Sequence, residues 1–111
     1  MAATGGADRL DAATLGAGPL GRRATLVQFS SAFCQPCRAT RAVLAEVAAM
    51  VDGVAHQEID AEGRLDLVRA LGVSGTPTVL VLDAEGRVVR RATGQPRRVD
   101  VIAALGAAIG G

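Results

Sequence analysis

The sequence predicts a mixed α/β fold in which a central β-sheet is flanked by helices on both faces. Three observations support this prediction. Apolar, β-branched segments alternate with segments of helical spacing, which is typical of a partly parallel sheet with helical crossovers. Two strand-like segments later in the chain enclose a short turn, so a hairpin adds antiparallel strands. A length of 111 residues with 50% hydrophobic content indicates one globular domain over residues 1–111.

The N-terminal part of the chain carries weak signals. Residues 1–7 are small and polar, and we expect a flexible linker or residues left behind where an upstream anchor was removed. Residues 8–20 space three leucines among Ala and Gly, which indicates only a short strand or a turn of helix. The run Ala-Thr-Leu-Val-Gln-Phe-Ser at 24–30 is apolar and β-branched enough to form a buried strand.

Helical spacing begins inside a Cys-X-X-Cys run. Apolar residues recur every three or four positions over 36–50, and Pro36 is tolerated only in the first turn of a helix. Gly53 interrupts this pattern, and residues 54–59 predict a second short strand.

The second half of the chain predicts a helix, a hairpin and a last helix. Residues 64–71 place apolar side chains on one face, as a short amphipathic helix does. Strands are expected at 78–82 and 87–91, joined by a turn at 83–86. Apolar residues at helical spacing over 99–109 predict the C-terminal helix.

The only two cysteines, Cys34 and Cys37, lie where a strand ends and a helix begins. Disulfide exchange requires one exposed cysteine that forms a thiolate easily and a second one that resolves the mixed disulfide. Cys34 precedes the helix, whose unpaired N–H groups and dipole favour negative charge. Cys37 follows one turn later and can attack back. This setting indicates a redox pair.

The chain resembles the thioredoxin family, including its membrane-anchored TlpA-like branch. The residues that carry the resemblance are Phe33-Cys34-Gln35-Pro36-Cys37-Arg38 after a hydrophobic strand, Gly75-Thr76-Pro77 before a later strand, and Asp60, Gly86 and Gly94. The element order also agrees over residues 24–109. The resemblance implies a thioredoxin fold and an enzyme that exchanges disulfides with proteins, acts as a reductant in electron transport and needs no cofactor.

The resemblance also implies a substrate groove. Pro77 would be a cis-proline beside the disulfide, and Thr76 would offer backbone hydrogen bonds to an extended substrate; an ordinary trans proline on an edge strand is the alternative. The expected groove comprises Phe33, Pro36, Gly75, Thr76, Pro77 and Gly94. The family commonly has Trp where this chain has Phe33, so the indole N–H donor is lost.

A second departure concerns the proton of Cys37. The family's buried acid corresponds to Gln28, which cannot accept a proton. His56, the only histidine, falls on the next strand near the place of a family lysine. We therefore advance the hypothesis that Gln28 and His56 form a neutral or switchable substitute beneath the cysteines. The alternative is a hydrogen-bonded strand histidine with no such role.

Two other functions use the same cysteines. A copper or zinc carrier could bind metal through both thiolates, although structural zinc takes four ligands and this chain offers only Cys34, Cys37 and His56, so no metal site is expected. A thioredoxin-like binding module with a structural disulfide is the other alternative. So small a loop gives a disulfide little entropic stabilisation, which favours a redox role.

Charge and composition restrict the partners. A net charge of +1 argues against nucleic acid. Five arginines at 87, 90, 91, 97 and 98 form either a solvated face or a docking patch for an acidic partner. The expected partners of this monomer are disulfide-containing proteins and an electron donor, either a reductase or a membrane dithiol carrier. A soluble, cytoplasmic domain is expected, or an extracytoplasmic one if an anchor preceded it. The all-arginine basic residues suggest a GC-rich, bacterial gene.

Overall fold

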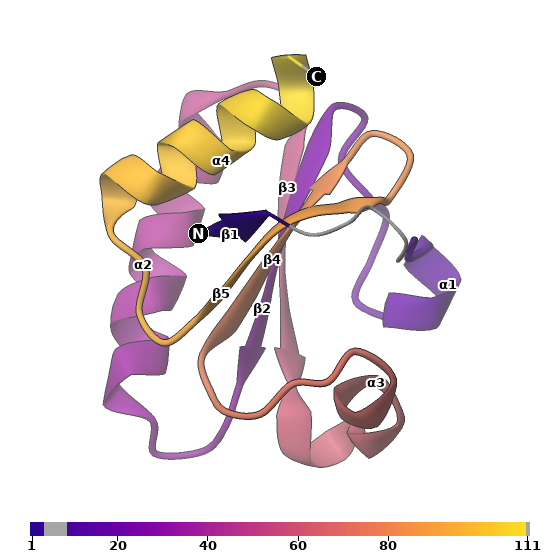
Figure 1. Ribbon diagram of the computed structural model, residues 1–111, viewed down its shortest axis with the longest axis vertical. Coiled ribbons are helices and arrows are strands. Elements are labelled where there is room, and N and C mark those ends of the chain that lie inside the picture. Colours follow the sequence, from indigo (N-terminus) through magenta and orange to yellow (C-terminus); the bar gives the residue numbers. More distant parts are fainter. Residues whose placement is uncertain (4–8, 111) are drawn as a thin grey trace.

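A five-stranded sheet forms the centre of the computed structural model, which describes residues 1–3 and 9–110 (Figure 1). The strand order is β1-β5-β4-β2-β3. The strands are β1 (Ala2–Ala3), β2 (Ala24–Ser30), β3 (Val54–Asp60), β4 (Thr78–Asp83) and β5 (Val88–Thr93). Strand β2 runs parallel to β3 and antiparallel to β4, and the other two pairs are antiparallel. The predicted mixed sheet is confirmed.

Helices cover both faces of the sheet (Figure 1). They are α1 (Ala12–Leu15), α2 (Gln35–Met50), α3 (Leu65–Ala70) and α4 (Arg98–Gly110), with a 3₁₀ turn η1 (Ala61–Gly63). Helices α2 and α4 pack on one face, whereas α1 and α3 lie over the other. Within the described ranges, no helix is long and apolar enough to cross a membrane.

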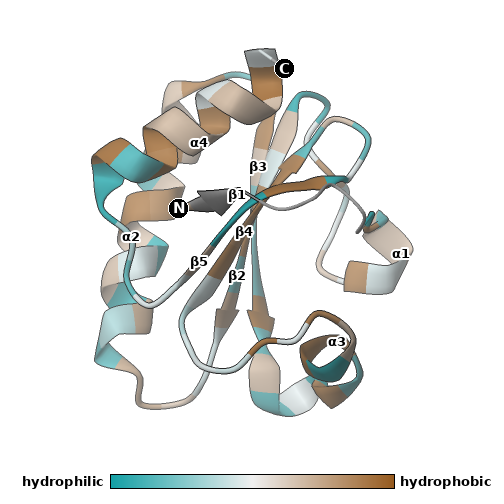
Figure 2. Ribbon diagram, in the orientation of Figure 1, coloured by the Kyte–Doolittle hydropathy of each residue, from teal (hydrophilic) through white to brown (hydrophobic). Residues whose placement is uncertain are grey.

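Strand β2 is buried over its whole length. Because successive side chains of a strand point to opposite faces, Ala24 and Leu26 join the core under α2 and α4, while Val27 and Phe29 join the core under α1 and α3. Figure 2 shows hydrophobic residues along the central strands and hydrophilic ones at the turns and at the start of α4. The apolar run at 24–30 thus becomes the central strand of a sheet with two cores.

The N-terminus differs from the expected linker. Ala2 and Ala3 pair with Arg91 and Arg90 of β5, because that strand would otherwise leave its outer backbone groups unpaired. Residues 4–7 of the expected linker lie outside the described residues. The weakly predicted segment 8–20 contains α1, a single turn of helix whose Asp11 carboxylate accepts a hydrogen bond from the Thr14 N–H at 2.7 Å.

The β4–β5 hairpin depends on a glycine. Gly86 has a φ of 84°, and a Cβ built on it would lie 2.1 Å from the carbonyl oxygen of Leu10. The Leu10 N–H donates to the Gly86 carbonyl at 2.8 Å, so the segment after the N-terminus is held against this turn. The position therefore requires glycine for two reasons, the left-handed backbone and the close approach of another chain segment.

Replacing Gly86 with Ala is expected to lower the free energy of unfolding by about 2–3 kcal/mol, measured by urea denaturation. Gly72 is the matched control: its φ is also positive, at 63°, but a Cβ there meets nothing within 4 Å. Gly72→Ala should therefore cost only about 1 kcal/mol, from backbone strain alone. Equal losses in the two variants would show that the Leu10 contact contributes nothing.

Candidate active site

Cys34 and Cys37 form a disulfide at the N-terminus of α2. Cys34 is the N-cap residue of this helix, and its Sγ accepts a hydrogen bond from the Cys37 N–H at 3.2 Å. Cys34 is half-buried, whereas Cys37 is only 1% exposed. Cys34 is therefore the more accessible residue of the pair. The helix N-terminus favours negative charge on the Cys34 sulfur when the disulfide is reduced.

Local sequence determines this helix start. Pro36 occupies the first turn of α2, where a missing N–H is harmless and the fixed φ suits a helix. The Thr40 hydroxyl donates to the Pro36 carbonyl at 2.7 Å. Phe33, directly before the N-cap, has a φ of 58°, which is uncommon for a bulky residue, and its side chain is fully exposed. The phenyl ring thus stands in solvent beside Cys34.

The loop before β4 faces the disulfide. The Thr76–Pro77 peptide bond is cis, and the Thr76 carbonyl oxygen lies 3.9 Å from the Sγ of Cys34. The Thr76 hydroxyl is hydrogen-bonded to the Ser31 hydroxyl at 2.7 Å, and the Gly94 N–H donates to the Pro77 carbonyl at 2.8 Å. The loop before β4 and the segment after β2 therefore meet beside Cys34.

A mainly apolar groove of about 260 Å³ continues from this loop. Its lining residues are Ser31, Ala61, Glu62, Leu65, Val68, Val73, Ser74, Gly75 and Thr76. Of the expected groove residues, Gly75 and Thr76 line it. Phe33, Pro36, Pro77 and Gly94 are not among its lining residues, although Pro77 and Gly94 are hydrogen-bonded to each other behind Thr76. The sequence did not single out Leu65 or Val73, whose apolar character matched an ordinary helix face and loop.

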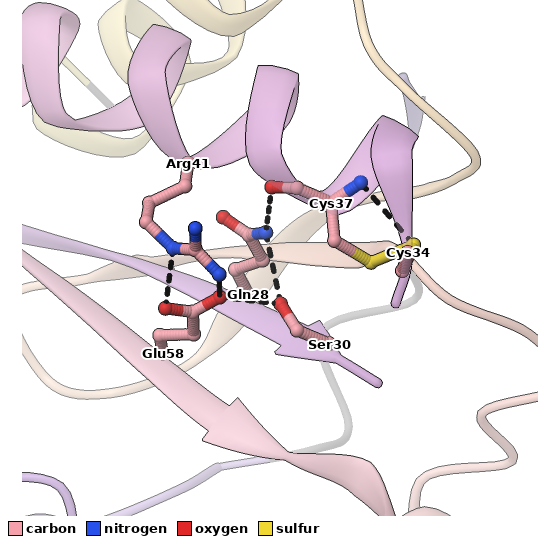
Figure 3. A network of polar contacts seen from close by, with 6 residues as sticks. All are labelled: Gln28, Ser30, Cys34, Cys37, Arg41 and Glu58. Atoms are coloured by element: carbon pink, nitrogen blue, oxygen red, sulfur yellow. Dashed lines mark hydrogen bonds and ion pairs between the residues drawn. A yellow bond between two sulfur atoms is a disulfide. The ribbon is translucent and has the colours of Figure 1, made fainter. Parts of the chain in front are cut away.

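Beneath the helix start, a chain of hydrogen bonds extends from Cys37 to an ion pair (Figure 3). The Gln28 side-chain amide donates to the Cys37 carbonyl at 2.8 Å and to the Ser30 hydroxyl at 2.9 Å. The Ser30 hydroxyl donates to Glu58 at 2.6 Å, and Arg41 binds both oxygens of that carboxylate at 2.7 Å. The Arg41 contact lowers the pKa of Glu58 below its ordinary value, while partial burial opposes this shift.

His56 lies on β3 but outside this chain of hydrogen bonds. Its Nε2 and the Oε1 of Gln28 are buried without a hydrogen-bond partner among the described residues, so no hydrogen bond joins the two side chains. Burial lowers the pKa of His56, the charge of Arg41 lowers it further, and the charge of Glu58 opposes the shift. The structure thus connects Gln28 to Glu58 rather than to His56.

Glu58, Ser30 and Arg41 were missed from the sequence. Alternation along residues 54–60 does place His56, Glu58 and Asp60 on one face, and Arg41 follows Cys37 by one helical turn. The register of the parallel pair β2–β3 places Gln28 beside Glu58 and so brings this group of side chains together. No sequence signal specified that register.

Each of the five C-terminal arginines forms an ion pair or a hydrogen bond within the chain. Arg87, Arg97 and Arg98 form ion pairs with Asp83, Asp100 and Glu46, respectively. Arg90 and Arg91 donate to the carbonyls of Val89 and Leu71. This arrangement favours a solvated face. Within residues 1–3 and 9–110, no three His, Cys, Asp or Glu side chains are grouped as ligands of a metal ion.

Comparison with solved structures identifies the fold. The chain superposes on chloroplastic thioredoxin z with a TM-score of 0.71 and 25% identity, covering 81% of each chain. For a mutant thioredoxin of Halobacterium salinarum the TM-score is also 0.71, at 22% identity over 79% of this chain and 76% of that one. Mitochondrial thioredoxin 3 of Saccharomyces cerevisiae gives 0.67 at 15% identity, covering 78% and 79%. A search of the curated proteins found no match.

A sequence model of the thioredoxin family matches residues 20–107, which include all the elements from β2 to the body of α4. The matched segment contains the cysteine pair at the start of α2 and the Thr76–Pro77 loop opposite it. These features together are those of a thiol–disulfide oxidoreductase, and the chain belongs to the thioredoxin family.

Proposed function

We propose that this chain is a single-domain reductant of protein disulfides that works through Cys34-Gln35-Pro36-Cys37. The observation that carries the proposal is the asymmetry of the pair: Cys34 is half-buried and faces the Thr76 carbonyl at 3.9 Å, whereas Cys37 is buried behind it. A nucleophile that must meet a partner has to be accessible, and a resolving thiol has to be close and protected. The two cysteines meet these different demands.

The reaction starts from the reduced pair. The Cys34 thiolate attacks one sulfur of a substrate disulfide, so a bond forms between protein and substrate while the substrate's S–S bond breaks and its leaving sulfur takes up a proton. Cys37 then loses its proton and attacks the Cys34 sulfur, which releases the second substrate thiol. The substrate gains two electrons and two protons, and the cysteines end as the Cys34–Cys37 disulfide.

Substrate binding is assigned to the surface around Cys34. An extended segment could hydrogen-bond to the backbone at Thr76 and place side chains in the groove formed by Leu65 and Val73. The exposed ring of Phe33 borders Cys34 and supplies further apolar contact. Unfolded or extended protein segments with apolar side chains are the substrates that this surface fits best.

The reducing direction rests on the residues between the cysteines. Gln35-Pro36 keeps the proline found in reducing thioredoxins and lacks the histidine of strongly oxidising relatives. A dithiol donor, either a reductase or a membrane dithiol carrier, must return electrons to the pair. The reduction potential should lie nearer to about −270 mV than to about −120 mV, as measured by equilibration with dithiothreitol.

Replacing Cys37 with Ser should trap the first intermediate. The Cys34 thiolate can still attack a disulfide-bonded protein such as insulin, but no resolving thiol follows, so a mixed disulfide accumulates. Mass spectrometry under non-reducing conditions should show one adduct per chain, which dithiothreitol removes.

Cys34→Ser is the matched control and should form no adduct and show no reductase activity. Adduct formation at Cys37 in the Cys34→Ser variant, or insulin reduction by it, would contradict the assignment of the nucleophile. Stoichiometric, tightly held copper or zinc in the reduced wild-type chain would instead favour a metal carrier.

Phe33→Ala should affect protein and small-molecule disulfides differently. Because the ring is fully exposed beside Cys34, its removal leaves folding and thiol chemistry intact but takes away contact area with a protein substrate. We expect kcat/KM to fall by about fivefold to tenfold for insulin, which corresponds to about 1 kcal/mol of lost binding, and to change less than twofold for a small aromatic disulfide. Equal losses on both substrates would show that Phe33 acts on the cysteines instead.

A further inference from the structure

The hydrogen bonds beneath Cys37 have a defined direction. A backbone carbonyl only accepts, so the nitrogen of the Gln28 amide must face Cys37. The other N–H of that amide donates to the Ser30 hydroxyl, which leaves the hydroxyl proton to be donated to Glu58. Glu58 thus accepts from Ser30 and from Arg41 at the same time. Only an ionised carboxylate satisfies this arrangement.

Glu58 therefore places a negative charge at the end of a short path of polar groups that begins at Cys37. The first member, Gln28, is fully buried, and Cys37 is nearly so. Gln28 and Ser30 therefore exclude water from the inner part of this path, where charges interact more strongly, whereas Glu58 itself is partly exposed. Arg41 supplies a compensating positive charge from α2, the helix that begins with the cysteines.

Among the described residues, the other charged or titratable groups near the start of α2 have no hydrogen-bonded link to Cys37. Asp60 on β3 accepts a hydrogen bond from the Glu62 N–H, and Glu62 in η1 accepts one from the Ala32 N–H at 3.2 Å. Burial lowers the pKa of His56 on β3, which favours its neutral form. Arg38 on α2 is exposed. Among these described groups, only the ion pair of Glu58 and Arg41 is linked to Cys37 by hydrogen bonds.

Given the proposed redox function, we propose that Glu58 is the positioning residue that sets the proton affinity of the reduced cysteine pair, through Ser30 and Gln28, and that Arg41 limits its effect. The negative charge of Glu58 opposes formation of a thiolate, and the positive charge of Arg41 favours it. In the native chain each charge partly offsets the effect of the other. Removing one partner therefore leaves the other uncompensated.

Two substitutions test this proposal because they should have opposite effects. Glu58→Gln keeps the shape and an acceptor for Ser30 but leaves Arg41 unpaired, so the cysteines should become reactive at lower pH. Arg41→Gln leaves Glu58 unpaired, so they should become reactive at higher pH. A unit charge about 10 Å away at an effective dielectric constant of about 50 shifts such a midpoint by about half a pH unit. The readout is the rate of iodoacetamide alkylation of the reduced chain from pH 5 to pH 10.

Glu46 and Arg98 provide the matched controls. They form a second ion pair that also joins α2 to another element, and Glu46 lies nine residues beyond Cys37, roughly 14 Å along the helix. Glu46→Gln and Arg98→Gln should leave the alkylation midpoint within about 0.1 pH unit of the native value, because this pair is about half exposed and farther from the cysteines, so salt and water screen its charges, and no hydrogen-bonded path among the described residues links it to them. Circular dichroism would verify folding of all four variants.

The possible outcomes separate this proposal from the proposed function. Opposite shifts of the alkylation midpoint support it. Shifts in the same direction, as expected if both variants merely loosen the packing of α2, or no shift in either variant, would overturn it. A reduction potential that rises in Glu58→Gln and falls in Arg41→Gln provides a second measurement, since a stabilised thiolate favours the reduced state. Failure of the native chain to reduce insulin would instead refute the proposed function, because alkylation requires no substrate.

Discussion

Burial of β2 on both faces and along both edges is the constraint on which the site depends. All seven residues of this strand are buried, between the parallel strand β3 and the antiparallel strand β4. A carboxylate at position 28 would have to give up its hydration in this environment, which is costly without a buried cation. Gln28 avoids that cost and still satisfies the Cys37 carbonyl. The first turn of α2, and with it the disulfide, is thereby attached to the centre of the sheet.

The position of the ionic charge follows from the same constraint. Strand β3 ends the sheet order, and Glu58 on it keeps about 30% of its side chain exposed. Arg41 can reach this carboxylate from the surface of α2 with 48% of its own side chain in solvent. An ion pair at such a site is far less costly to desolvate than one beneath the helix, although it also contributes little to stability. We therefore relate this ion pair to the reactivity of the cysteines rather than to the stability of the fold.

The sequence predicted most of the fold because its signals were local. Each strand and helix from β2 onward was expected within two residues at each end, since periodicity, Pro36 and the glycines act within a few positions. The pairing of Ala2–Ala3 with β5 was missed because it depends on an edge formed about ninety residues later. Cys34 and Cys37 could be chosen as the candidate redox pair from their spacing and their place between a strand and a helix, whereas Glu58 could not be linked to them without the register of β2 against β3. The left-handed backbone of Phe33 also left no local signal, since glycine is the residue that usually marks such a conformation.

Two adjacent serines, Ser30 and Ser31, link the end of β2 to the two parts of the site, the ion pair of Glu58 and the loop that contains Thr76. Ser30, the last residue of β2, donates to Glu58, whereas Ser31, directly after the strand, is hydrogen-bonded to Thr76. The proposed substrate contacts therefore lie around Cys34, at Phe33 and the loop before β4, and the proposed control of proton affinity lies on the other side, beneath Cys37. Because different elements carry the two tasks, substitutions in one need not disturb the other. A scaffold organised in this way can keep its fold while identity to solved thioredoxins falls to 15–25%, and Gln28 supports the first turn of α2 without a buried charge.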